Sequence, residues 1–383
     1  MEKRYIFHEA DMNETIFYGS TIEAIHKAFT DEQIGDSPLY DEKSFAENLS
    51  SFRDTKYIFA TWIFRSLSEE EIGRYFPSLK AFFYAAGSVK AFGEAMFQHG
   101  VRVYSGWRAN AVPVAEWTVA QIILANKGYF QMTGRYRELG HDETIRLSDA
   151  FAGNFRNKVG IIGCGMIGEN VARLLQNFDL EVLVYDPYLD EGKAERLHVR
   201  KVSLEELFST CQTISNHLPD LPSTRGMLDY SLFSLMKDNA CFINTGRGQE
   251  VVEEDLVRAM REKRTRLALL DVTTPREPLE MDDYLFSEPN IMITPHRAGA
   301  FMGEIRRLGE YVWNSYLGYL DGADGDENEI TQSMLEHMAW EESVCLEAIG
   351  LEDISVIYAF SVKLHASKFG YLSDFLAKLG KWS

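Results

Sequence analysis

The sequence has few cysteines, no long apolar run and a shortage of basic residues, and each deficit excludes a class of protein. The four cysteines, at positions 164, 211, 241 and 345, have no metal-ligand spacing, so we predict no metal site and a reduced, cytoplasmic protein. No run approaches the roughly 18 apolar residues of a membrane-spanning helix, so we expect no membrane insertion. Residues 1–15 include basic residues but no apolar segment of the secretory type.

The charge balance excludes two kinds of partner. Asp and Glu number 58 against 39 Lys and Arg, giving a formal net charge of −19. Nucleic acids and anionic membrane surfaces attract clustered Lys and Arg, so we expect neither as a partner. The 383 residues, 45% hydrophobic and 25% charged, are typical of a globular protein with more than one domain.

The first 108 residues alternate strand-like and helix-like segments. Apolar runs at 4–10, 56–62 and 79–87 predict strands, and the segments 20–29 and 66–76 predict helices. Ser68 and Glu71 have the spacing of a capping box for the second helix. A long apolar helix is predicted over 113–129, with Pro113 in its first turn. The polar residues 131–157 predict an irregular arm.

From residue 158 the pattern becomes regular. Six short apolar runs, "KVGIIG", "EVLVYD", "TISNHL", "ACFINTG", "RLALLDV" and "NIMITP", alternate with helix-like segments. This alternation predicts an α/β fold with a doubly wound parallel sheet covered on both faces. The segment 301–320 predicts an amphipathic helix that crosses back to the first half of the chain, which would make that domain discontinuous.

A glycine-rich turn follows the first of these strands. Gly163, Gly165 and Gly168 form G-x-G-x-x-G between a strand and a helix, and the second strand ends in Asp186. This arrangement suits a dinucleotide, with pyrophosphate at the helix N-terminus and the carboxylate accepting hydrogen bonds from a ribose diol. Asp186 would repel a 2′-phosphate, so we predict NAD over NADP. The alternative is a structural turn in which Asp186 is a capping residue.

Three polar residues come shortly after consecutive strands. Arg247, Glu277 and His296 would meet at the carboxyl edge of a parallel sheet, where ligands bind. Reduction of a 2-keto acid needs a guanidinium to hold the carboxylate, an imidazole to donate a proton, and a carboxylate to orient that imidazole. Each residue alone could be a surface or structural group, but together they predict hydride-transfer chemistry with a nicotinamide.

The chain from about 80 to 318 resembles the D-isomer-specific 2-hydroxyacid dehydrogenases. The matching blocks include "VAEWTVAQIILA", "VGIIGCGMIG", "FINTGRGQEVVEEDL" and "PNIMITPHRAG". The resemblance implies a Rossmann-type NAD domain at 109–298, a smaller flavodoxin-like substrate domain at 1–108 and 299–340, and a homodimer built with the arm at 128–152. We expect residues 341–383 to form a helical C-terminal extension of unknown role, for which the family has no counterpart.

The resemblance also implies roles for individual residues. Arg247 would bind the substrate carboxylate, and Glu277 would pair with His296, the acid–base. The implied cofactor-binding residues are Gly163, Gly165, Met166, Ile167, Gly168, Asp186, His217, Pro219, Thr245, Gly246 and Asp271. The implied substrate-binding residues, besides Arg247 and His296, are Ser88, Val89, Trp62, Arg65 and Trp107.

Two departures concern the substrate side. The family loop G-x-G-x-D reads "AGSVK" at 86–90, and one extra residue separates Asp271 from Glu277. An aromatic and cationic set, to which Phe64, Tyr84 and Arg108 also belong, would suit a 2-keto acid larger than glyoxylate, unless these aromatics serve packing. A noncatalytic NAD-sensing protein, similar to the C-terminal-binding-protein corepressors, is the alternative function. Formate dehydrogenase is disfavoured, because we expect Gln in place of Glu277 there.

Overall fold

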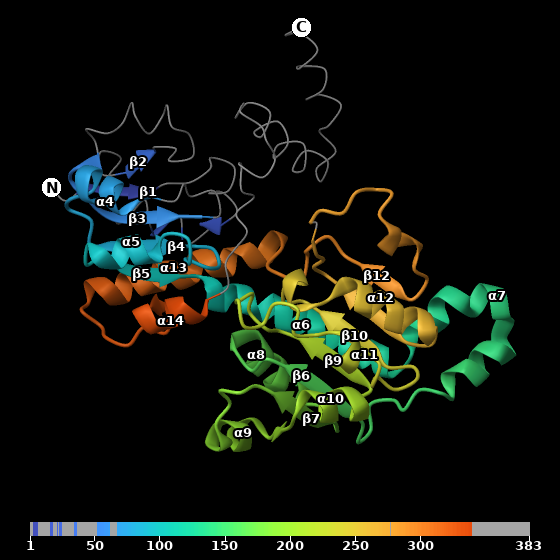
Figure 1. Ribbon diagram of the computed structural model, residues 1–383. Coiled ribbons are helices and arrows are strands. Elements are labelled where there is room, and N and C mark those ends of the chain that lie inside the picture. Colours follow the sequence, from blue (N-terminus) through green and yellow to red (C-terminus); the bar gives the residue numbers. More distant parts are fainter. Residues whose placement is uncertain are drawn as a thin grey trace, which may run out of the picture. The chain divides into compact units, whose positions relative to one another are not determined.

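The computed structural model contains two sheets, each flanked by helices (Figure 1). It describes residues 3–6, 16–17, 21, 23–24, 34–36, 52–61, 67–275 and 277–338. The predicted C-terminal extension and the positions of Trp62, Phe64 and Arg65 lie outside these ranges. The domain limits stated above remain a prediction.

The larger sheet has seven parallel strands in the order β12-β11-β10-β9-β6-β7-β8. The order reverses between β6 and β9, the point at which open α/β sheets bind ligands beyond their carboxyl ends. The doubly wound parallel sheet predicted from the apolar runs is thereby confirmed. Its strands are β6 (Lys158–Ile162), β7 (Glu181–Tyr185), β8 (Arg200–Lys201), β9 (Thr213–Asn216), β10 (Cys241–Asn244), β11 (Leu267–Leu270) and β12 (Ile291–Ile293).

Helices cover both faces of this sheet, because alternate strand residues point to opposite sides. Phe242 packs in one apolar cluster with α10, α11 and α12, while its neighbours Cys241 and Ile243 pack in another with α6 and α8. The bounds are α6 (Trp107–Asn126), α8 (Met166–Leu175), α9 (Glu191–Leu197), α10 (Leu204–Thr210), α11 (Tyr230–Phe233), α12 (Glu253–Glu262), η1 (Gly248–Glu250) and η2 (Tyr284–Ser287).

The smaller sheet has the order β13-β5-β4-β3-β1-β2, with only β13 antiparallel to its neighbour. Val312 and Tyr316 of α13 pack against Phe59 and Phe83 of this sheet, so the chain after residue 299 does return to it. The elements are β1 (Lys3–Ile6), β2 (Ile34–Asp36), β3 (Thr55–Ala60), α4 (Glu69–Tyr75), β4 (Ala81–Tyr84), α5 (Gly93–Gln98), β5 (Arg102–Ser105), η3 (Met302–Ile305), α13 (Arg306–Leu320), β13 (Glu329–Ile330) and α14 (Gln332–His337).

The capping box predicted for α4 is present. Ser68 Oγ accepts a hydrogen bond from Glu71 N, and Glu71 Oε2 accepts one from Ser68 N. Both bonds satisfy backbone donors that the first turn of a helix leaves unpaired. The local pattern alone therefore located the start of this helix correctly.

Two predictions about the middle of the chain are wrong. Helix α6 begins at Trp107, so Pro113 lies in its interior, where proline lacks the N–H that would bond to the carbonyl of Ala109. The segment predicted as irregular is largely helix α7 (Tyr129–Ser148), interrupted at Gly140 with φ 73°. Figure 1 draws α7 as two helical segments that meet at an angle. Because most of α7 is exposed to solvent, its residues are polar on nearly all sides and show no apolar periodicity that would indicate a helix.

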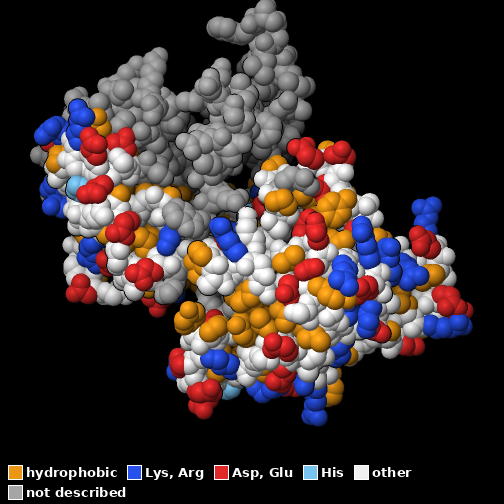
Figure 2. Space-filling view, viewed as in Figure 1, with side chains coloured by type: hydrophobic (Ala, Val, Ile, Leu, Met, Phe, Trp, Pro, Cys, Tyr) orange, Lys and Arg blue, Asp and Glu red, His pale blue; other side chains and the backbone are white. Residues whose placement is uncertain are grey.

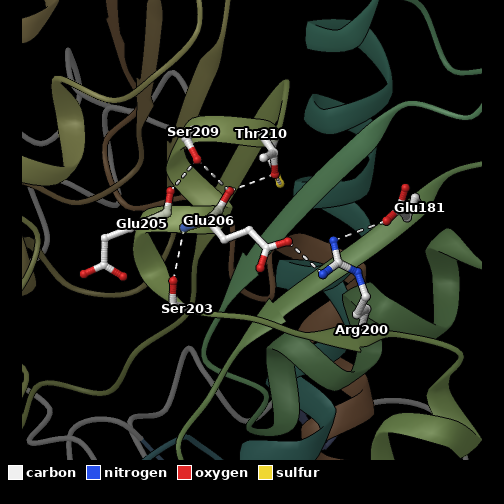
Figure 3. A network of polar contacts seen from close by, with 8 residues as sticks. Glu181, Arg200, Ser203, Glu205, Glu206, Ser209 and Thr210 are labelled. Atoms are coloured by element: carbon white, nitrogen blue, oxygen red, sulfur yellow. Dashed lines mark hydrogen bonds and ion pairs between the residues drawn. The ribbon is translucent and has the colours of Figure 1, made fainter.

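The short edge strand β8 escaped the sequence analysis because it has two polar, exposed residues instead of an apolar run. Arg200 ties it to the molecule: Nη1 lies 2.7 Å from Glu206 Oε1 and Nη2 lies 3.5 Å from Glu181 Oε1 (Figure 3). Ser203 caps α10 beside this pair through Glu206 N. Exposed ion pairs of this kind add little stability, so their main effect is to orient the edge strand.

Candidate active site

The glycine loop joins β6 to α8 at the carboxyl edge of the larger sheet. Gly163 has φ +85°, and a Cβ at Gly168 would lie 2.0 Å from Gly163 O, so both positions require glycine. A Cβ at Gly165 would meet nothing within 4 Å. The first turn of α8, with Met166 and Ile167, therefore presents an open backbone surface to an approaching phosphate.

Asp186 is bound to the same loop. Its Oδ2 accepts a hydrogen bond from Cys164 N at 2.6 Å, and its Oδ1 accepts one from Tyr188 N at 2.8 Å. The carboxylate thus has the capping contacts of the structural alternative. A carboxylate has about four acceptor sites, so the same group retains capacity for a ribose hydroxyl.

The loop after β10 holds Arg247 by its backbone. Arg247 N donates to Glu250 Oε2 at 2.7 Å, and Arg247 O accepts from Asn244 Nδ2 at 3.0 Å. The guanidinium Nη1 donates to Gly246 O at 2.9 Å. Both backbone groups of Arg247 are therefore fixed, and its side chain leaves from a rigid base.

The loops after β10 and β11 are in direct contact. A Cβ at Gly248 would lie 2.0 Å from Thr273 O, so the two backbones approach more closely than any other residue type permits. Asp271 N also donates to Asn244 O at 2.9 Å. The segment that carries Arg247 thus packs on the segment that leads to Glu277.

Asp271 joins the second loop to the third. Its Oδ1 accepts from Thr294 Oγ1 at 2.5 Å and from Arg297 N at 2.8 Å, and its Oδ2 accepts from Ala298 N at 2.8 Å. His296 N donates to Asp271 O at 3.0 Å. These bonds hold the turn that carries His296 and leave this buried carboxylate one acceptor site for a cofactor.

His296 and Glu277 face each other. His296 Nδ1 is hydrogen-bonded to Glu277 Oε1, and both side chains are partly exposed. The backbone of His296 is in the left-handed region, with φ +51°. The turn that follows the edge strand β12 thus directs an imidazole toward a carboxylate from the neighbouring loop.

Residues 120–298 match the model of the D-isomer specific 2-hydroxyacid dehydrogenase, NAD binding domain. The match contains the glycine loop, Asp186 and all three loops just described. This part of the chain is therefore similar to the NAD-binding domain of that family.

Two relatives of the dehydrogenase domain have similar sequences. YoaD of Bacillus subtilis is 34% identical over 213 residues, which are 54% of this chain and 60% of YoaD. Hydroxypyruvate reductase of Blautia hydrogenotrophica is 34% identical over 165 residues, 43% of this chain and 51% of the relative. The chain thus spans between half and two thirds of the length of these relatives.

A solved structure shares the dehydrogenase fold over more of the chain. Apo D-mandelate dehydrogenase of Rhodotorula graminis superposes with a TM-score of 0.72 over 86% of this chain and 98% of its own, at 17% identity. That likeness concerns the fold alone. Among the residues that the structure describes, no helix is long and apolar enough to span a membrane.

Other residues predicted to bind the cofactor lie around a buried histidine of the dehydrogenase domain. His217 Nε2 is 2.9 Å from Ser215 Oγ, and Nδ1 is 3.1 Å from Thr245 Oγ1. Burial lowers the pKa of His217 to about 3, so this imidazole is neutral. Thr245 also lies 3.4 Å from Thr118 of α6. Pro219 follows, with its carbonyl accepting from Thr224 Oγ1 at 2.6 Å.

Ser88 and Val89, which were predicted to bind the substrate, lie in the "AGSVK" loop that follows β4 of the smaller sheet. Ser105 Oγ donates to Gly87 O at 2.5 Å, Lys90 N donates to Ser88 Oγ at 3.2 Å, and Val89 is buried. Lys90 Nζ donates to Leu335 O at 2.6 Å, so this cation anchors α14.

The aromatic and cationic residues expected near the substrate differ in their surroundings. Tyr84 is buried and packs edge-on against Phe92, which supports the packing alternative for this residue. Arg108 Nε donates to Glu327 O at 2.7 Å, so its guanidinium is held by the chain itself. Trp107 is half-buried at the start of α6. The other three positions lie outside the described ranges.

The sequence analysis missed three buried polar residues beneath Arg247. Asn216 and Asn244 end adjacent strands in register, and Asn216 Nδ2 donates both to Asn244 Oδ1 at 3.0 Å and to Glu250 Oε2 at 3.3 Å. A signal was available, because an asparagine ends each of two consecutive apolar runs. Glu250, in contrast, looked like one more acid before an acidic helix.

Proposed function

We propose that the protein is an NAD(H)-dependent oxidoreductase that interconverts a 2-keto acid and a D-2-hydroxy acid. The observation that carries the proposal is the His296–Glu277 contact, on loops that share backbone hydrogen bonds with the loop of Arg247. A histidine held by a carboxylate at the same sheet edge as a dinucleotide loop is the arrangement that acid–base catalysis of hydride transfer needs.

The roles of the three residues follow from their atoms. Glu277 engages Nδ1, so the imidazole offers Nε2 to the substrate and donates the proton from there to the keto oxygen. Arg247 has a planar fork of donors for the substrate carboxylate. Glu277 stabilises the imidazolium before transfer and fixes its orientation. The nicotinamide, when bound, supplies the hydride.

The cofactor groups of this chain favour NAD. The open backbone at Gly165 suits the pyrophosphate, and Asp186 suits a ribose diol while repelling a 2′-phosphate. The residues of the cofactor site therefore fit a dinucleotide. We propose His217, Thr245, Gly246 and Asp271 as walls of the same site, at the carboxyl ends of β9, β10 and β11.

NADH oxidation with glyoxylate, hydroxypyruvate and phenylpyruvate tests the activity. His296→Gln should lower turnover by on the order of 10²–10⁴-fold while NADH binding stays nearly unchanged. His296→Asn is the matched control for the backbone, because Asn tolerates the left-handed conformation found here. Unchanged turnover in both variants would contradict the role of His296.

The same panel separates the proposal from its alternative. Tight NADH binding without turnover of any keto acid would favour the noncatalytic NAD-sensing protein. We propose a keto acid larger than glyoxylate as substrate from the aromatic residues of the sequence, although Trp107 also packs against the apolar cluster of Phe82 and Phe92. Equal efficiency across the three keto acids would remove that preference.

We also propose that the protein forms a homodimer through α7. This helix makes few contacts within its own chain, and Tyr129, Tyr136 and Ile145 on it are exposed apolar residues.

Figure 2 shows charged side chains of both signs mixed over the visible face of the molecule, without one continuous basic surface. We therefore expect a small-molecule substrate and a second copy of the chain as binding partners, and no nucleic acid.

A further inference from the structure

Glu250 is a buried acid directly beneath the substrate-binding arginine of the proposed function. It ends η1, its residue exposure is 0%, and its backbone carbonyl accepts from Leu228 N at 2.9 Å. Leu228 and Val251 pair beside it and belong to the apolar cluster under β9 and β10. An acid in such a place needs either a cation or a proton.

The hydrogen bonds show which oxygen would carry a proton. Oε2 accepts from Arg247 N at 2.7 Å and from Asn216 Nδ2 at 3.3 Å. Oε1 is buried and has no hydrogen-bond partner among the residues that the structure describes. An ionised carboxylate would leave charge on Oε1 without a donor, whereas a carboxylic acid has a carbonyl oxygen at Oε2 and a hydroxyl at Oε1.

The surrounding charges agree with a neutral acid. Burial raises the pKa of Glu250 to about 8, although the backbone and charge of Arg247 and the amide of Asn216 oppose the rise. Asp220 adds to it, even though Arg225 Nε is 2.7 Å from Asp220 Oδ1. These are the charged groups that face Glu250 from η1 and from the segment after β9.

We propose that Glu250 is a positioning residue that acts as a neutral acid: it fixes the Arg247 backbone without placing a negative charge beside the guanidinium. The inference rests on the proposed function, because it assumes that Arg247 binds the substrate carboxylate. Because a protonated Glu250 carries no charge, the positive charge of the Arg247 guanidinium remains available to bind the substrate carboxylate. Loss of the proton would create a buried anion that attracts the guanidinium and repels the substrate.

The affinity of the NADH-bound enzyme for oxamate, measured between pH 6.5 and 9.5, tests this role. Other groups that change charge over this range act on the wild type and the variant alike, so the informative quantity is the ratio of wild-type affinity to that of Glu250→Gln. We expect this ratio to fall by at least about tenfold as pH rises through 8. Glu254→Gln, at an exposed position on α12, is the matched control and should keep a constant ratio.

A constant ratio for Glu250→Gln would overturn the positioning role. So would a Gln variant that fails to fold, because Gln reproduces the shape and charge of the neutral acid. Loss of NADH binding in the Gln variant would overturn it too, because Gln can keep the hydrogen bonds that Oε2 accepts from Arg247 N and Asn216 Nδ2.

Thermal unfolding separates this proposal from the proposed function. In the unfolded chain Glu250 ionises near its ordinary pKa of 4.5, whereas in the folded protein it ionises near 8. Wild-type stability should therefore fall relative to Glu250→Gln as pH rises from about 4.5 to about 8, and the difference should stay constant above that range. Parallel pH curves would overturn the proton assignment. Wild-type protein that binds no oxamate at any pH would instead overturn the proposed function, and with it the role toward the substrate.

Discussion

At the scale of single residues, carboxylates in this protein serve the backbone and the chemistry at once. Asp186 caps Cys164 N and Tyr188 N, and Asp271 accepts three hydrogen bonds from the turn of His296. A substitution at either position therefore combines a loss of stability with any loss of function. A ratio of rates for two substrates, measured on the same variant, is not affected by the loss of stability.

Asp186→Ala should lower the ratio of kcat/KM for NADH to that for NADPH by on the order of tenfold, because the variant no longer repels a 2′-phosphate. Steady-state kinetics with both cofactors measure this ratio. Asp190→Ala is a suitable control, since Asp190 also accepts a backbone hydrogen bond, from Lys193 N at 2.8 Å, but caps α9. An unchanged ratio in Asp186→Ala would contradict the role of this carboxylate in cofactor choice.

At the scale of elements, the contact between the loops of Gly248 and Thr273 holds the candidate site together. Gly248→Ala would place a Cβ 2.0 Å from Thr273 O, and backbone cannot move aside as a side chain can. We expect a loss of roughly 1–3 kcal/mol in the free energy of unfolding, with a lower kcat. Urea denaturation and steady-state kinetics measure the two effects.

Gly303→Ala is the control for that substitution. Gly303 lies in η3, where a Cβ would meet nothing within 4 Å, so this variant should be unchanged or more stable by up to about 1 kcal/mol. Equal stability of Gly248→Ala and the wild type would show that the two loops can separate without cost.

The sequence predicted the strands and the residues of the candidate site better than the hydrogen bonds between those residues. The parallel sheet was predictable because β10 and β11 are buried at every position and their runs are largely apolar. Glu277 and His296 followed, since parallel strands deliver their next residues to one edge. Pairing of their side chains depends on the hydrogen bonds of Asp271, which no periodicity reports.

The remaining elements were missed for identifiable reasons. Pro113 suggested the start of a helix, but residues 107–112 already form helix before it. In α7, a sequence with few apolar residues and two glycines conceals a helix that lacks a buried face of its own. Glu250 is buried by tertiary contact with Leu228, from a segment 22 residues earlier in the chain.

At the scale of the whole molecule, the exposed apolar side chains of α7 predict association. Ile145→Asp should convert a dimer into monomers at micromolar concentration, because a charge would replace an apolar residue that is 51% exposed in the isolated chain. Size-exclusion chromatography with light scattering measures the mass. Met281→Asp, at a 93% exposed methionine outside α7, is the control and should leave the mass unchanged. A monomeric wild type would contradict the proposed dimer.

The two-residue strand β13 has a consequence for how the protein behaves at high concentration. It pairs antiparallel with β5 and covers the outer edge of that strand. Arg102 of β5 donates hydrogen bonds to Glu329 of β13 from Nε at 2.7 Å and from Nη2 at 2.5 Å. A longer, unprotected border would offer a row of amide and carbonyl groups to strands of other molecules. Truncation before residue 329 would uncover that border, so shortened versions of the chain should aggregate sooner than versions that retain it.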